Sequence, residues 1–261
     1  MTNRDGYQLV EYWVSSSSVS LKSLNVLVLV TNMGAITNLK RTDIGSTIGD
    51  FKKGQELDDR YASYDYCSNY FRPKTGVCIT DDMEKSCLAL GFYLASWGMY
   101  RGSSFLLNKS AHVYVPLIEY LSTLDDSIWE IDAHSLVQNS EELIDIYGHI
   151  RSRLIPSRST HIVLTTKIMM GIFGSVPAFD SFFVLAFKEI FKGRCAFSSF
   201  NKVSLSCIEE FYLANQESID FEAHKIKTLN FDGGTKGHSY TRAKVIDMYG
   251  FTKGLEISDS R

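Results

Sequence analysis

A lysine and an aspartate on either side of a glycine turn are the residues of this sequence best suited to chemistry. The chain reads LTTKIMMGIFGSVPAFDSFF from residue 164 to residue 183, with Lys167 before the turn and Asp180 after it. An ionised aspartate at the start of a helix can stabilise an oxocarbenium-like transition state and orient an attacking water. It can equally cap the helix by accepting hydrogen bonds from backbone N–H groups. The sequence leaves both roles open for Asp180.

The turn itself predicts contacts with a phosphate backbone. Gly171, Gly174 and Ser175 allow a tight turn whose backbone N–H groups can face a phosphate. Lys167 has three possible roles: a nucleophile if the turn folds it toward the same pocket as Asp180, a phosphate contact, or an exposed helix lysine.

A second candidate is the segment WGMYRGSSF, residues 97–105. Aromatic rings beside an arginine and between glycines can stack on an extruded base and bind its edge or its phosphate. We therefore predict a base pocket of Trp97, Tyr100, Arg101 and Phe105. The alternative is that the two outer rings belong to the core and that the arginine is a surface cation.

A third cluster lies near the C-terminus, around Gly233, Gly234 and Gly237. Its basic side chains are those of Lys225, Lys227, Lys236, Arg242 and Lys244. We predict DNA contacts for Lys236 and Arg242, although a solvated loop accounts for the cluster equally well. The cluster is not a Walker motif, because Gly-Lys-Ser/Thr and a preceding strand are lacking.

The glycine turn and the Pro-Ala-Phe-Asp corner that follows it resemble the helix-hairpin-helix DNA glycosylases. In that superfamily a glycine hairpin holds a DNA phosphate and a carboxylate at a helix start faces the flipped nucleotide, a role that the resemblance gives to Asp180. The usual Leu-Pro-Gly-x-Gly core is missing here, and Asp180 follows Gly174 sooner than in the familiar hairpin. The corner is closer to variant glycosylases in which a Phe-Pro-x-x-Asp type sequence opens the helix.

Three segments together resemble a widespread bacterial family. They are the Trp-Gly-x-x-Arg-Gly-Ser-Ser sequence from Trp97, the Val-Pro-Ala-Phe-Asp corner, and Arg60-Tyr61-Ala62-Ser63. The resemblance implies a glycosylase that acts on modified bases in defence against phage DNA.

Helices must position these residues, since apolar side chains recur at helical spacing along most of the chain. We expect a helix in the apolar stretch that ends near Val30, one with an aromatic stripe ending before Pro73, and one capped by Asp81 with Glu84. Further helices should begin at Pro116 and Ser140. Ser159 or Thr160 should cap the helix that enters the glycine turn, Asp180 the helix that leaves it, and Gly250 should end the last helix.

The predicted fold is mainly α: a helical two-lobed bundle with a helix-hairpin-helix-like element and a central groove. With 261 residues and no repeat or linker, we expect one domain over residues 1–261 whose lobes are interleaved. Residues 1–150 carry a net charge of −7 (12 Lys and Arg against 19 Asp and Glu), and residues 151–261 carry +4 (15 against 11). A basic face that binds phosphates would produce this asymmetry, and so would chance.

Composition excludes several classes of protein. Five cysteines, without a C-x-x-C pair or a histidine at metal-ligand spacing, indicate free thiols and no metal site. No cofactor is expected. The longest aliphatic run is too short for a membrane span, and no secretory signal is evident, so we expect a cytoplasmic protein.

The function predicted from the sequence is that of a DNA N-glycosylase, a hydrolase that flips a modified base and cleaves its glycosidic bond at Asp180. DNA is the expected partner, with no membrane and no obligate protein partner. The alternative is a non-catalytic nucleic-acid-binding helical module, and a third class is a helical protein–protein adaptor. The sequence does not distinguish the base, the strandedness of the DNA or the oligomeric state.

Overall fold

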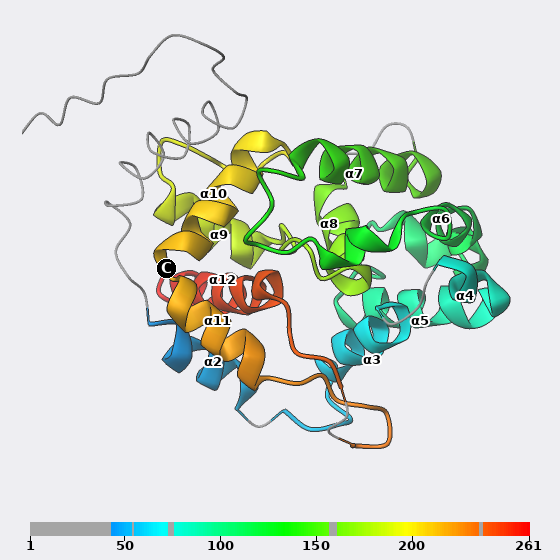
Figure 1. The fold of residues 1–261 in the computed structure, drawn as a ribbon, viewed down its shortest axis with the longest axis horizontal. Coiled ribbons are helices and arrows are strands. Elements are labelled where there is room, and N and C mark those ends of the chain that lie inside the picture. The colour runs from blue at the N-terminus through cyan, green and yellow to red at the C-terminus, as the bar shows by residue number, and fades with distance from the viewer. Residues whose placement is uncertain (1–42, 54, 73–75, 157–160, 235–236) are drawn as a thin grey trace, which may run out of the picture. The chain divides into compact units, whose positions relative to one another are not determined.

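The computed structural model describes residues 43–53, 55–72, 76–156, 161–234 and 237–261, which belong to one compact unit within residues 39–261 (Figure 1). The helix predicted to end near Val30 and the predicted DNA contact at Lys236 lie outside these residues. The expectation of a single domain over the whole chain therefore stays a prediction.

The described part of the chain is helical, which confirms the predicted mainly α class. Among the described residues, β-structure is confined to an isolated antiparallel bridge between Lys227 and Ser239. The α-helices are α2 (Ile44–Lys52), α3 (Ala62–Phe71), α4 (Gly76–Asp81), α5 (Met83–Ser96), α6 (Val115–Leu121), α7 (Ser140–Leu154), α8 (Ile162–Ile172), α9 (Ser181–Ile190), α10 (Lys202–Ala214), α11 (Gln216–Lys225) and α12 (Arg242–Asp259), with short 3₁₀ turns at Phe105–Asn108, Ala111–Tyr114 and Asp126–Glu130.

Most predicted helix starts are confirmed, but two caps differ. Asp82, not Asp81, caps α5, because its carboxylate accepts a hydrogen bond from the N–H of Lys85 at 3.0 Å. His161 precedes α8 without a side-chain cap, whereas Ser159 and Thr160 lie outside the described residues. The predicted cap at Asp180 is present.

The last helix was predicted to stop at Gly250, and this is wrong: α12 continues to Asp259. Gly250 and Gly254 lie one turn apart on the face of α12 that packs against α9. A Cβ added to Gly250 would meet the Phe183 ring, and one added to Gly254 would meet the Phe182 backbone. These glycines allow two helices to approach closely, so they are packing positions and not a C-cap.

One continuous hydrophobic core joins the described helices. Helices α9 and α12 lie side by side and share the most extensive helix contact (Figure 1), while α5 packs against both α3 and α8. The phenylalanines of α9 stack along its buried face, with Phe183 and Phe187 ring centroids 4.2 Å apart. The core thus holds α5, α8, α9 and α12 in fixed positions. Helices α8, α9 and α12, together with residues 97–105 that follow α5, provide most of the lining of the site described next.

Candidate functional site

The glycine turn ends α8 and redirects the chain toward α9. Gly174 has φ of +68°, and its N–H donates to the carbonyls of Met169 and Met170 at 3.2 and 3.0 Å. A glycine suits this left-handed position because it has no Cβ, and one would lie 2.9 Å from Thr241 Cγ2. The turn is therefore anchored inside the protein.

Two side chains from neighbouring helices hold the Pro-Ala-Phe-Asp corner. The N–H of Phe179 donates to Thr166 Oγ1 of α8, and the N–H of Ala178 donates to Asp247 Oδ1 of α12, both at 2.9 Å. These backbone groups are buried, so each needs an acceptor within the protein. The corner is consequently fixed from both sides, and the residue that follows it is Asp180.

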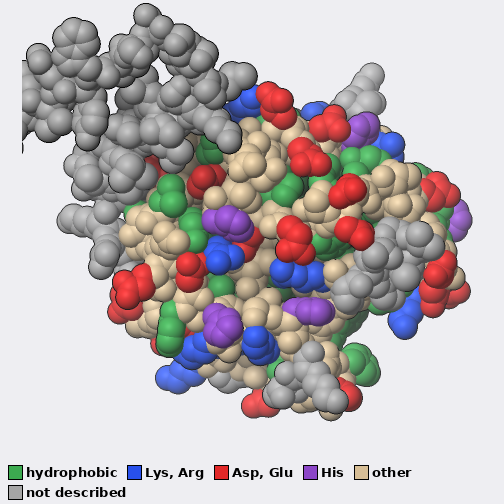
Figure 2. Space-filling model, in the orientation of Figure 1, with side chains coloured by type: hydrophobic (Ala, Val, Ile, Leu, Met, Phe, Trp, Pro, Cys, Tyr) green, Lys and Arg blue, Asp and Glu red, His purple; other side chains and the backbone are tan. Residues whose placement is uncertain are grey.

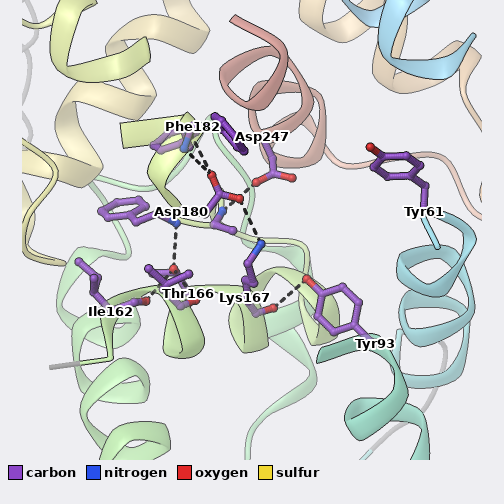
Figure 3. A network of polar contacts seen from close by, with 12 residues as sticks. Tyr61, Tyr93, Ile162, Thr166, Lys167, Asp180, Phe182 and Asp247 are labelled. Carbon is purple, nitrogen blue, oxygen red and sulfur yellow. Dashed lines mark hydrogen bonds and ion pairs between the residues drawn. The ribbon is translucent and has the colours of Figure 1, made fainter. Parts of the chain in front are cut away.

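Asp180 both caps a helix and forms an ion pair. Its Oδ1 accepts from the N–H groups of Phe182 and Phe183 at 3.1 and 3.0 Å, and its Oδ2 lies 3.1 Å from Lys167 Nζ (Figure 3). The Lys167 side chain is only 4% exposed and that of Asp180 15% exposed. The interpretation of Lys167 as an exposed helix lysine is thus wrong, whereas the expected helix cap at Asp180 is confirmed.

Tyr93 joins α5 to α8 below this pair. Its ring fills the space beside Gly171, where a Cβ would collide with it, and its hydroxyl donates to the carbonyl of Lys167 at 3.1 Å (Figure 3). Burial, followed by the nearby Asp247 carboxylate, raises the pKa of Tyr93 well above its ordinary value. The hydroxyl therefore remains a hydrogen-bond donor throughout the physiological pH range.

The ion pair opens into a pocket of about 430 Å³. Lys167 and Asp180 form part of its wall, and Phe182 and Phe251 supply apolar surface from α9 and α12. The described residues that line it are Arg60, Trp97, Gly98, Met99, Arg101, Ser103, Ser104, Phe105, His161, Val163, Leu164, Lys167, Asp180, Ser181, Phe182 and Phe251. A pocket of this size and mixed lining is suited to a small organic ligand.

Another part of the wall is the predicted aromatic segment after α5. Trp97, Arg101 and Phe105 line the pocket, as does Gly98. Gly98 has φ of +77°, and the Arg101 side chain folds over it so closely that a Cβ would lie 3.0 Å from Arg101 Cζ. Tyr100 is not among the lining residues, because its hydroxyl is 2.7 Å from that of Tyr114.

A second buried lysine–aspartate pair lies behind Trp97. Lys244 Nζ is 2.8 Å from Asp247 Oδ2, and the Lys244 side chain is 3% exposed. The same ammonium lies 4.9 Å from the Trp97 ring centroid, while Lys167 Nζ lies 5.0 Å from it. Both pairs thus meet at one indole ring.

The remaining residues predicted to bind DNA do not join this site. Gly171, Gly174 and Ser175 are buried, and the Ser175 hydroxyl has no hydrogen-bond partner among the described residues. The Arg242 Nε donates to Asp220 at 2.6 Å, and its guanidinium is 3.5 Å from Asp132. Neither the glycine turn nor Arg242 is among the described residues that line the pocket.

Sequence reasoning missed several residues of the site. Lys244 belongs to the basic cluster predicted near the C-terminus, but the sequence did not predict that it or Asp247 would lie near this pocket, since both are far along the chain from Asp180. Arg60 was quoted as part of a resembling segment but not as a pocket residue, and His161 was not considered. A basic residue followed by a tyrosine, as in Arg60-Tyr61, is too common a pattern to identify a site alone.

The visible surface carries charges of both signs. Figure 2 shows Lys and Arg side chains interspersed with Asp and Glu on this face, without a single basic stripe. No group of three or more potential metal ligands occurs among the described residues. Likewise, none of the helices that the structure describes is long and apolar enough to cross a bilayer.

The chain matches no protein-family model, no curated protein and no solved structure. The functional argument therefore depends on the pocket and on the residues that line it.

Proposed function

We propose that this protein is a DNA glycosylase-like enzyme that flips a modified base out of DNA and hydrolyses its N-glycosidic bond. The observation that carries the proposal is the meeting of Asp180 and Lys167 with Trp97, Arg101 and Phe105 in one pocket. In this proposal α8, the glycine turn and α9 act as a helix-hairpin-helix-like element beside a groove between two lobes.

Asp180 is the proposed catalytic residue. As the bond between C1′ and the base nitrogen breaks, positive charge develops on the sugar, and a carboxylate beside it stabilises that charge. A water oriented by the carboxylate forms the new C1′–O bond and loses a proton, while the base leaves with the electron pair of the broken bond and a proton. The Lys167 ammonium and the helix N–H groups keep the Asp180 carboxylate in place.

The other lining residues support recognition of a nucleotide. Arg60 and Arg101 are exposed and cationic, which suits contacts with the phosphates on either side of a flipped base. Phe105 and Phe182 offer apolar surface to the base. The resembling bacterial family suggests phage DNA with modified bases as the natural substrate.

The test is to incubate the purified protein with phage DNA that contains modified bases and with unmodified DNA, and then to cleave abasic sites. We expect strand breaks with at least one modified DNA, and a loss of at least 100-fold in rate for Asp180→Asn, since Asn retains the cap but not the charge. Asp82→Asn, which changes another capping aspartate outside the pocket, should keep the wild-type rate.

Base release that survives in Asp180→Asn would overturn the assignment of this residue. DNA binding by the wild type without base release from any substrate would instead favour a non-catalytic nucleic-acid-binding module. Circular dichroism on each variant separates these outcomes from a failure to fold.

A further inference from the structure

The charges around the pocket are strongly unequal. Three lining residues, Arg60, Arg101 and Lys167, are cationic, and Lys244 lies behind the wall. Asp180 is the carboxylate among the described lining residues, and Asp247 pairs with Lys244. Among the described residues at the pocket and beside its wall, four cations thus accompany two carboxylates.

Asp180 already has a cationic partner before any ligand binds. Its two oxygens already accept hydrogen bonds from the N–H groups of Phe182 and Phe183 and from the ammonium of Lys167. A positively charged ligand would have to compete with Lys167, which is held in place by burial. A carboxylate paired in this way attracts a cationic base less than an unpaired one would. Its remaining acceptor position can still orient a water, and its charge can still stabilise the charge that develops on the sugar during bond cleavage.

Trp97 is also unable to serve as a cation-binding ring. Indole is the aromatic group that attracts cations best, but here Lys167 Nζ and Lys244 Nζ already lie 5.0 and 4.9 Å from its centroid. Lys244 is fixed by Asp247 and contacts the Tyr64 ring at 4.3 Å as well. A further positive charge at this ring would be repelled by two ammonium groups in a poorly hydrated region.

We infer that the pocket accepts a neutral or anionic nucleobase and rejects a positively charged one, with Lys244 as a specificity-determining residue behind Trp97. This inference rests on the proposed function, because it assumes that the ligand is a flipped nucleotide. It predicts that bases with uncharged or acidic modifications are substrates and that cationic alkylated purines are not.

Two isomeric bases test the role of charge without a change in composition. N6-methyladenine is neutral at pH 7, whereas 1-methyladenine in a nucleotide is protonated and cationic. We would measure the binding of fluorescein-labelled single-stranded pentanucleotides with either base at the centre by fluorescence anisotropy at low salt. Single strands remove the contribution of base pairing. The wild type should bind the neutral isomer at least tenfold more tightly.

The double variant Lys244→Met, Asp247→Asn removes the buried ammonium without leaving an unpaired carboxylate, and Asn retains an acceptor for the Ala178 N–H. It should reduce the ratio of the two dissociation constants at least threefold. The matched control is Lys253→Met, Glu256→Gln, which neutralises an exposed lysine–glutamate pair on the same helix and should leave the ratio unchanged.

Equal binding of the two pentanucleotides by the wild type, tighter binding of the cationic one, or no binding of either would overturn the inference. An unchanged ratio of the two dissociation constants in a folded Lys244→Met, Asp247→Asn variant would also overturn it. If the protein discriminates by charge but releases no base from any DNA, the inference stands and the proposed activity fails. If it releases bases without such discrimination, the activity stands and the inference fails.

Discussion

At the scale of single residues, Asp180 has two roles that the structure does not separate. It accepts hydrogen bonds from two N–H groups of α9 and pairs with a buried lysine. The capping role was predictable from the sequence, because a carboxylate before an apolar helical run is a typical N-cap. The pairing was not, because it depends on how α8 and α9 are oriented.

Comparison of Asp180→Asn with Asp180→Ala measures the cap alone. Both variants lose the negative charge beside Lys167, but Asn can still accept hydrogen bonds from the N–H groups of α9, while Ala cannot. We expect the alanine variant to be less stable than the asparagine variant by about 1 kcal/mol in urea unfolding. Equal stabilities would show that the cap contributes nothing measurable.

Asp65 gives the protein a predictable pH dependence. Burial raises the pKa of this carboxyl above its ordinary value of 3.8, although Tyr240 donates to it at 2.6 Å. The folded state therefore binds a proton more readily than the unfolded state, so Asp65 lowers the free energy of unfolding as pH rises from about 3.8 through the raised pKa. In Asp65→Asn this decrease should be absent, as chemical denaturation from pH 3 to pH 8 would show. Parallel curves for both proteins would contradict this.

At the scale of helices, the contact between α9 and α12 brings together Phe182 and Phe251, whose ring centroids are 5.1 Å apart and which both line the pocket. Apolar periodicity predicts both helices, but the sequence also predicts a helix end at Gly250, because glycine is common at helix C-termini. Whether a glycine ends a helix or receives a neighbouring helix depends on what packs against it. Here the phenylalanines of α9 pack against Gly250 and Gly254, so these glycines lie inside α12. The sequence of α12 alone does not reveal which residues pack against it.

Alanine in place of Gly254 tests this packing. Alanine favours helix formation, but its Cβ would overlap the Phe182 backbone, so α9 would have to move. We expect a loss of about 1–3 kcal/mol in the free energy of unfolding from overpacking. Gly148→Ala in α7, where a Cβ meets nothing within 4 Å, should instead stabilise by about 0.5–1 kcal/mol. Stabilisation by both substitutions would disprove close packing at Gly254.

Thr166 connects α8 to the corner that carries Asp180. Thr166→Val removes the acceptor of the buried Phe179 N–H, which should cost about 1–3 kcal/mol in stability. Because the corner would shift, base release should slow more in Thr166→Val than in Thr165→Val. The Thr165 hydroxyl donates to the His161 carbonyl and holds no part of the corner. Thermal melts and single-turnover rates for the two valine variants provide this comparison.

At the scale of the whole described unit, one core runs through all the helices that build the pocket. Composition and periodicity predicted the helical class, since helical spacing is a local property. The arrangement of the helices was not predictable, because it results from long-range contacts such as those between α5 and α8. Two lobes around a groove therefore stay a prediction, and the continuous core argues that they would not be independent.

Cooperative unfolding would reflect that continuity. Trp97 lies beside the pocket, whereas Trp129 packs against Phe173 with ring centroids 5.0 Å apart. The third tryptophan of the chain is Trp13. When Trp13 and one of the other two tryptophans are replaced by phenylalanine, the fluorescence reports on the single remaining indole. We expect the two fluorescence transitions to coincide in urea. Separate midpoints in these variants, at equal overall stability, would indicate two lobes that unfold independently.

Tyr93 limits how the pocket can respond to a ligand. Because its ring fits against Gly171 and its hydroxyl holds the Lys167 carbonyl, α5 and α8 form a rigid wall. In the segment 97–105 that follows α5, Gly98 and Gly102 have left-handed backbone conformations, which residues with a Cβ rarely adopt. Bulkier residues at these two positions would therefore strain that segment, whereas the ion pair between α8 and α9 would keep its partners.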